Sequence, residues 1–493
     1  MTVQEANFTF DNSYARELDG FYVPWQGANF PAPKMLRFNR ELAIELGLEP
    51  EALANDHGAA VFSGTQSPQG ADPLAMAYAG HQFGGFSPQL GDGRALLIGE
   101  VIDRSGNRRD IQLKGSGRTP FSRGGDGKAV LGPVLREYLM GEAMHGLGIP
   151  TTRALAAVTT GEAVERDGYK PGAVLTRVAS SHLRVGTFQF FAARGETDKV
   201  RQLADYAIAR HYPELTGAKD RYLGLLQRVA AAQAALVAQW VLVGFVHGVM
   251  NTDNMTISGE TIDYGPCAFL DAYDPNAVFS SIDHHGRYAY GNQPTIAQWN
   301  LARLAETLLD LINPNDSEDA IRQATNAINA FPLLYQTEWL KGMRAKLGLA
   351  NDIPGDLDLA NDLFSAMEGQ NVDFTLLFRH LADALRGDTA PAKGLFKNPT
   401  PFEGWLDRYN RRFEKEDAVP VALAEAMDRV NPLYIPRNHM VEAALEAALQ
   451  NDMEPFDKLL AAITAPFASR PGFADHAQPA PESFGPFTTF CGT

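Results

Sequence analysis

The 493-residue sequence has two cysteines and no long run of lysine or arginine. So few cysteines exclude a disulfide scaffold and any zinc module with several cysteine ligands, and they favour a reducing compartment. The chain carries 43 basic and 59 acidic side chains, a formal net charge of -16. Because an acidic chain without a basic face is repelled by a phosphate backbone, we expect no nucleic-acid partner.

Targeting and membrane-spanning segments are also scarce. The N-terminal residues MTVQEANFTF lack the basic and apolar regions of a secretory signal, so a cytoplasmic location is expected. Only the stretch Val229 to Thr252 is uncharged and long enough to cross a bilayer. Gln233 and His247 lower its hydrophobicity, and Asp253 follows it directly. We therefore expect a buried helix and no membrane partner, with a membrane span as the alternative.

Several common catalytic signatures are missing. The sequence contains no complete Walker A motif, GxGxxG, HExxH, GxSxG or paired CxxC. P-loop, Rossmann, zinc-protease and esterase functions therefore have no support from motifs. The absence of internal repeats argues against solenoids and propellers.

Glycines are concentrated between residues 80 and 130, among strand-like runs at 94–101 and 110–114. This pattern predicts a small sheet with glycine-rich turns. A helix is expected at 133–145, where apolar residues recur at helical spacing behind a proline suited to a first turn. Two further strands are expected, at 154–159 and 172–178.

Beyond residue 195 the periodicity is helical, with helices expected at 196–212, 219–250 and 296–312 and amphipathic segments to about 465. A sheet followed by helices predicts an α+β, bilobal fold, and that order suits a nucleotide cleft between lobes. The last helices either brace the core or recognise protein substrates. The expected divisions are an N-terminal extension (1–75), a small glycine-rich sheet lobe (76–195), a helical lobe (196–315) and a helical C-terminal extension with a tail (316–493).

Lys114 ends an alternating strand beside a glycine-rich loop, where a lysine can hold phosphate oxygens. Glu137 follows on the expected helix, at a spacing that permits the strand-to-helix ion pair known from protein kinases. The alternative is a solvated lysine and an unrelated surface glutamate. Taken alone, these two residues favour that alternative.

A second group of residues continues the kinase order of histidine, catalytic aspartate, metal-binding asparagine and Asp-Phe-Gly. Asn254 lies at the expected spacing from His247, and Asp263 begins an Asp-Tyr-Gly sequence. Both residues offer hard oxygen ligands for Mg²⁺ or Mn²⁺. The position of the usual catalytic base is Val249, which leaves Asp253 to compensate. The combined order indicates a metal-dependent nucleotide binder.

Longer segments carry a more specific signal: YAGHQFGGFSPQLGDGRA, DIQLKGSGRTPFSRGGDGKAVL, REYLMGEAMHGLGIPTTRAL, HGVMNTDNM, IDYGPCAF and NPLYIPRN. They resemble the selenoprotein-O family of kinase-like protein adenylyltransferases, and the resemblance extends from about residue 75 to the end. It implies a protein-kinase-like fold that binds ATP in a flipped pose and exposes the α-phosphate. AMP then passes to a Ser, Thr or Tyr hydroxyl of a protein substrate.

The resemblance also implies a role for each matched residue. Lys114 holds phosphate, and Glu137 orients the side chain of Lys114. Asn254 and Asp263 bind Mg²⁺ or Mn²⁺, and Asp253 is the catalytic acid or base. The other nucleotide-binding residues that it implies are Gly91, Gly93, Arg94, Asp126, Gly127, Arg177 and Arg184, with Asp263 shared between nucleotide and metal.

Within this set, glycines lack a Cβ and so permit close approach of the nucleotide. Arg177 and Arg184 are implied to hold its outer phosphates, which guanidinium groups fit well. Without the resemblance, both arginines are better explained as surface residues beside a strand end.

Cys491 is third from the C-terminus, where some family members carry selenocysteine, so the chain resembles a member with cysteine in that place. A disulfide between Cys267 and Cys491 would tie the tail across the active-site region. The alternative is two independent thiols, because sequence does not give the Cα separation that decides between them.

Three functions stay open at this point. Protein adenylyl transfer is the first. The second is an ordinary metal-dependent phosphotransferase that uses Asp253 as its base, and the third is an inactive nucleotide-binding scaffold. Val249 at the usual base position favours the first and third over the second. The oligomeric state is not indicated.

Overall fold

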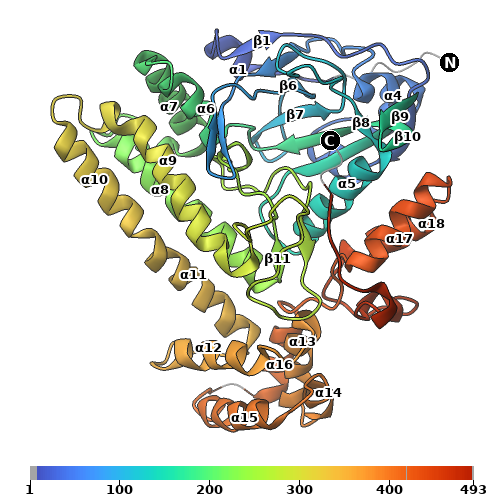
Figure 1. The fold of residues 1–493 in the computed structure, drawn as a ribbon, viewed down its shortest axis with the longest axis vertical. Coiled ribbons are helices and arrows are strands. Elements are labelled where there is room, and N and C mark those ends of the chain that lie inside the picture. Colours follow the sequence, from blue (N-terminus) through green and yellow to red (C-terminus); the bar gives the residue numbers. More distant parts are fainter. Residues whose placement is uncertain (1–7, 418, 491–493) are drawn as a thin grey trace.

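The computed structural model describes residues 8–417 and 419–490 (Figure 1). Its first half is built around one sheet of eight strands, all paired antiparallel. In spatial order the strands are β1 (Tyr22–Pro24), β3 (Leu74–Met76), β6 (Ala95–Ile102), β7 (Arg108–Lys114), β10 (Gly168–Ala179), β9 (Arg153–Arg166) and β2 (Lys34–Phe38), with β8 (Ala129–Val130) paired to β10.

Helices cover both faces of this sheet. On one face lies α5 (Leu131–Gly146), whose residues Leu135, Leu139 and Met140 are completely buried. The other face is covered by α4 (Asp56–Ser63). Burial of apolar side chains on both faces explains why α5 is held firmly against β9 and β10.

The same helix is also fastened on its far side. Arg136 of α5 donates to the carbonyl oxygen of Cys267 (2.7 Å) and pairs with Glu442 (2.9 Å). Glu442 belongs to α17 (Asn438–Leu449), which packs on α5 together with α18 (Glu454–Ile463), as Figure 1 shows. The C-terminal helices thus brace a helix of the sheet half.

Four long helices form the centre of the second half: α8 (Arg221–Leu242), α9 (Gln293–Ile312), α10 (Ser317–Asn329) and α11 (Phe331–Lys346). Shorter helices surround a second core that includes Trp405 and Phe374. They are α12 (Asp356–Met367), α13 (Phe374–Leu385), α14 (Ala390–Lys393), α15 (Thr400–Phe413) and α16 (Pro420–Asp428). The remaining helices of eight or more residues, α6 (Val185–Ala192) and α7 (Thr197–His211), lead from the sheet into α8.

The expected α+β class is confirmed, but one element is wrong. The helix expected at 219–250 ends at Leu242, and Gly244 then adopts a left-handed φ of 75°. The chain continues as the short strand β11 (Phe245–Val246), paired with β12 (Ala268–Phe269). An unbroken apolar run does not distinguish a buried helix from a buried strand, which explains the error.

One helix in the described residues, α8, is long and apolar enough to cross a membrane by length and composition. Its apolar window is 67% buried inside the protein. A core helix has this property, in agreement with the expectation of a buried helix.

A buried arginine fastens the C-terminal region to the segment after β12. The side chain of Arg437 is fully buried, donates to Asp373 (2.7 and 3.2 Å) and donates to Asp271 (2.7 Å). Such a pair is costly to break because the remaining carboxylate stays buried without compensation.

We therefore expect Arg437→Ala to lower the free energy of unfolding by about 3–5 kcal/mol. Arg408→Ala is the matched control, because Arg408 forms an exposed pair with Asp362 and should cost about 1 kcal/mol or less. Urea denaturation of both variants checks this difference. Equal losses would contradict the role assigned to Arg437.

Candidate active site

Asp263 is the centre of a buried cluster of charges. Its Oδ1 accepts hydrogen bonds from Lys114 Nζ (2.7 Å) and Arg177 Nη1 (2.6 Å), and its Oδ2 accepts one from Arg184 Nη1 (2.9 Å). Burial alone would raise the pKa of this carboxyl, but the three cations hold it well below its ordinary value. Asp263 also has a φ of 64°, which is uncommon for a residue with a side chain.

Glu137 of α5 joins this cluster. It accepts from Lys114 Nζ (2.6 Å) and from Arg177 Nη1 (3.1 Å). The expected strand-to-helix ion pair is therefore present, and a solvated lysine is excluded because the Lys114 side chain is only 12% exposed. Arg177 and Arg184 are both 2% exposed, so their interpretation as surface arginines is wrong.

The register of the sheet explains how two of these cations meet. Gln112 and Lys114 are two residues apart on β7 and therefore face the same side. Arg177 lies directly opposite Gln112 on β10, and its Nε donates to Gln112 Oε1 (2.8 Å). Cross-strand pairing thus brings Arg177 beside Lys114.

Arg184 connects the cluster to the segment that carries Asp253. It immediately precedes α6, and its Nη1 donates both to Asp263 and to the carbonyl oxygen of Asp253 (2.7 Å). Its guanidinium lies 4.5 Å from the centre of the Tyr78 ring, a cation–π distance. One buried side chain therefore fixes two parts of the site.

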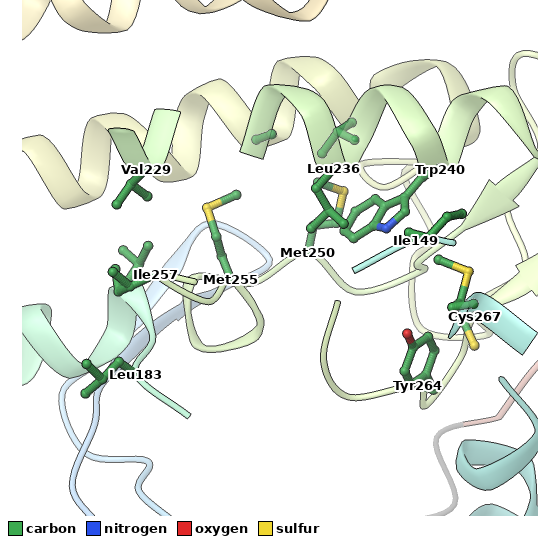
Figure 2. Packing of buried hydrophobic residues seen from close by; sticks show 14 of the residues in the cluster. Ile149, Leu183, Val229, Leu236, Trp240, Met250, Met255, Ile257, Tyr264 and Cys267 are labelled. Carbon is green, nitrogen blue, oxygen red and sulfur yellow. The ribbon is translucent and has the colours of Figure 1, made fainter. Parts of the chain in front are cut away.

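Asp253 and Asn254 lie on a single 3₁₀ turn, η2 (Thr252–Asn254), which apolar residues hold on both sides. Figure 2 shows Val229, Leu236 and Trp240 of α8 on the side facing Met250, Met255 and Ile257. Trp240 also donates from Nε1 to Thr261 Oγ1 (2.9 Å). Packing on α8 therefore sets the position of a turn that has little regular structure of its own.

A hairpin of β4 (Gly80–Gln82) and β5 (Gly85–Ser87) lies against this turn. Gln82 Nε2 donates to Asp253 Oδ2 (3.2 Å), a contact that the sequence analysis missed although Gln82 stands in a matched segment. A Cβ on Gly80 would lie 2.4 Å from Asp253 Oδ1, so only glycine fits there. Burial raises the pKa of Asp253 to about 6.

These side chains line a cleft of about 290 Å³, which has Gly93, Arg94, Lys114, Arg177, Arg184, Asp253, Asn254 and Asp263 in its walls. A neighbouring hollow of about 440 Å³ shares Arg94 and Lys114 with the cleft. It is lined by Ala129, Val134 and Leu175 and is therefore more apolar. The two openings together offer a charged end and an apolar end.

Not every expected nucleotide-binding residue lies in these walls. Gly91, Asp126 and Gly127 do not line either opening, and Asp126 pairs with Arg166 (2.9 Å). A Cβ on Gly91 would meet Phe121, and one on Gly127 would meet the carbonyl of Gly117. In this structure these glycines allow two segments of the same chain to approach each other closely. Their contact with a nucleotide stays a prediction.

One of the two cysteines, Cys491, lies outside the described residues. Cys267 is buried, and burial raises the pKa of its thiol to about 12. The pairing of the two cysteines therefore stays a prediction.

Two side chains offer oxygen atoms to a cation. Asn254 Nδ2 donates to the carbonyl of Val249 (3.0 Å), which leaves the amide oxygen available beside Asp263. Across residues 8–417 and 419–490, no group of three or more His, Cys, Asp or Glu residues could hold a metal. The pair nevertheless fits Mg²⁺, which keeps several waters and is commonly shared with substrate phosphates.

Lys114, whose side chain is 12% exposed, and two buried arginines surround the carboxylates of Asp263 and Glu137. Cations gathered in this way are of the kind that binds phosphate groups. A family model described as "Protein adenylyltransferase SelO" matches residues 4–464. The chain is 63% identical over 488 residues to the "Protein nucleotidyltransferase YdiU" of Cereibacter sphaeroides (strain ATCC 17025 / ATH 2.4.3), covering 99% of this chain and 100% of that protein.

Proteins of the same name in two other organisms are similarly close. Identity is 57% in Mycobacterium sp. (strain KMS), over 99% of this chain and 100% of the relative. Identity is 58% in Rhizobium rhizogenes (strain K84 / ATCC BAA-868), over 98% of this chain and 97% of the relative. The chain therefore belongs to the SelO family and is an enzyme, a nucleotidyltransferase. The resemblance inferred from the sequence segments is confirmed.

A second buried polar group supports the loop that precedes Arg184. Asp110 accepts from the backbone and ring nitrogens of His182 (both 2.9 Å) and from Arg210 (2.5 Å). Burial lowers the pKa of His182 to about 4, so the imidazole is neutral near pH 7. Its role is structural.

This histidine predicts a dependence of stability on pH. Because its folded-state pKa lies below the unfolded value of about 6.5, its contribution is complete above pH 6.5 and is lost as pH falls towards 4. Relative to His182→Gln, the wild type should lose up to about 3 kcal/mol between pH 7 and pH 4. Urea denaturation of both proteins across this range measures the difference. A difference that does not change with pH would contradict a buried neutral imidazole.

Proposed function

We propose that the enzyme transfers AMP from ATP to Ser, Thr or Tyr hydroxyls of proteins, with ATP in a flipped orientation. The observation that carries this proposal is the complete burial of Arg177 and Arg184 in the cleft. Buried guanidinium groups are strong partners for phosphate oxygens, which they can bind through two parallel hydrogen bonds. They favour a pose in which the outer phosphates enter the cleft first.

The neighbouring apolar hollow supports the same orientation. Ala129, Val134 and Leu175 provide a surface suited to the adenine ring, and Lys114 borders both openings. A nucleotide that spans them would place its α-phosphate between the charged end and the apolar end. This is the phosphate that an attacking hydroxyl must reach.

Binding of phosphate would redistribute the charges of the cleft. Lys114, Arg177 and Arg184, which all contact Asp263 in this structure, would turn to phosphate oxygens. Asp263 and Asn254 would then hold Mg²⁺ or Mn²⁺. When bound, the cation offsets negative charge on the phosphates.

Asp253 would act as the general base. It would accept the proton of the acceptor hydroxyl while that oxygen bonds to the α-phosphorus. The bond from the α-phosphorus to the bridging oxygen breaks, and pyrophosphate leaves. Gln82 holds the carboxylate during this step through its amide. We propose a cytoplasmic setting with protein substrates and with neither nucleic acid nor membrane as a partner.

Transfer of label tests the reaction directly. We expect label on protein from ATP labelled at the α-phosphate and none from ATP labelled at the γ-phosphate, with Mg²⁺ or Mn²⁺ present. Asp253→Asn should lower the rate by at least about 100-fold, because it removes the base. Label from the γ-phosphate would instead establish a phosphotransferase. No label from either, with ATP still bound, would favour an inactive scaffold.

The orientation of ATP has a separate test. If Arg184 holds an outer phosphate, Arg184→Gln should weaken ATP binding at least about tenfold, since a charged hydrogen bond is worth about 1.5–3 kcal/mol. AMP affinity should change by less than about twofold. Isothermal titration calorimetry measures both, and the thermal transition without ligand checks the fold.

Arg194→Gln is the matched control, because Arg194 is exposed and its guanidinium lies over Phe190, outside the cleft walls. It should bind both nucleotides as the wild type does. Equal weakening of AMP and ATP in Arg184→Gln would place the outer phosphates elsewhere and reject the flipped pose.

A further inference from the structure

A second groove borders the cleft on the side of the β4–β5 hairpin. It has a volume of about 600 Å³, and its walls include Phe83, Ile282, His284, His285 and Arg287. Phe83 and Ile282 also line the cleft that contains Asp253. A chain lying in this groove therefore has a continuous path to the active site.

The hairpin presents Phe83 in an unusual conformation. Phe83 has a φ of 51°, and its backbone N–H donates to Asn251 Oδ1 (3.1 Å) and to the Tyr288 hydroxyl (3.2 Å). A bulky residue adopts such a φ only where its surroundings enforce it. The result is a 38% exposed phenylalanine beside the 47% exposed Ile282, at the boundary of the cleft. Large apolar side chains exposed together at a site mark a binding surface.

Arg287 gives the groove a positive charge. Its guanidinium lies 4.8 Å from the Trp299 ring centre, but no ion pair within 4.0 Å joins it to a carboxylate of residues 8–417 or 419–490. The adjacent Asp283 instead accepts the backbone N–H groups of Arg287 (2.9 Å) and Tyr288 (2.8 Å). In a chain of net charge -16, this cation is complementary to a carboxylate on a partner.

We propose that this groove binds the acceptor segment of the protein substrate in an extended conformation. A bulky apolar residue of the segment lies on Phe83 and Ile282, and an acidic residue pairs with Arg287. The inference rests on the proposed transfer to protein hydroxyls and adds the substrate class: hydroxyls flanked within a few residues by both an apolar and an acidic side chain.

Mapping of modified sites tests the proposal. The wild type and Arg287→Glu are given ATP and a mixture of peptides prepared from a cell lysate, and mass spectrometry locates each AMP. The wild type should select acidic residues at a fixed spacing from the modified hydroxyl. Arg287→Glu should lower that selection at least about threefold and select basic residues there. Arg287→Lys should retain the acidic preference, and Arg322→Glu, an exposed residue of α10, should resemble the wild type.

Affinity for ATP should be unchanged in the Arg287 variants, because Arg287 does not line the cleft. Two results would reject the groove as the binding site of the acceptor segment and leave the proposed function standing. One is modified peptides without a preference for acidic residues, and the other is the same acidic preference in Arg287→Glu as in the wild type. Modification of folded lysate proteins but of no peptide would reject the groove too. A change of oligomeric state in Arg287→Glu, measured by sedimentation, would assign the groove to a second copy of the chain. If the wild type modifies neither peptides nor folded proteins, the proposed function itself fails.

Discussion

The carboxylate of Asp263 is the point on which the arrangement of the cleft depends. Lys114 reaches it from β7, Arg177 from β10, and Arg184 from the start of α6. An isolated buried charge is expensive, so each of these groups needs the others to be in place. Three elements that are distant in the sequence are thereby fixed around one residue.

Apolar packing fixes the position of the turn that carries Asp253, while the charge cluster fixes the cations beside it. The turn that carries Asp253 has residues anchored on α8 on either side, and Arg184 joins it to the cluster through the Asp253 carbonyl. The β4–β5 hairpin then closes over Asp253 through Gln82 and through the bare backbone of Gly80. Neither core nor cluster would suffice alone, because a short 3₁₀ turn contributes few hydrogen bonds of its own.

Local patterns in the sequence were enough to predict α5 and the main strands, because each depends on periodicity. The spacing of Lys114 and Glu137 only permitted their ion pair, and it took the order of the later residues and the family resemblance to favour it over a solvated lysine. Local patterns were not enough for α8, where an apolar run continued past Gly244 into a strand. The burial of Arg177 depends on the β7–β10 register, and the contact of Gln82 with Asp253 depends on a hairpin docking far along the chain. Both depend on tertiary contacts, which leave no pattern in the local sequence. The resemblance to a family, not composition, supplied the specific reaction.

The contacts between α17 and α5 join an early part of the chain to a very late one. Arg136 stands next to Glu137 on α5, and it is held by Glu442, which lies 306 residues later in α17. A ribosome makes the sheet, the cations and the turn that carries Asp253 well before it makes α17. The helix that orients Lys114 therefore gains its last support only when the chain is nearly finished.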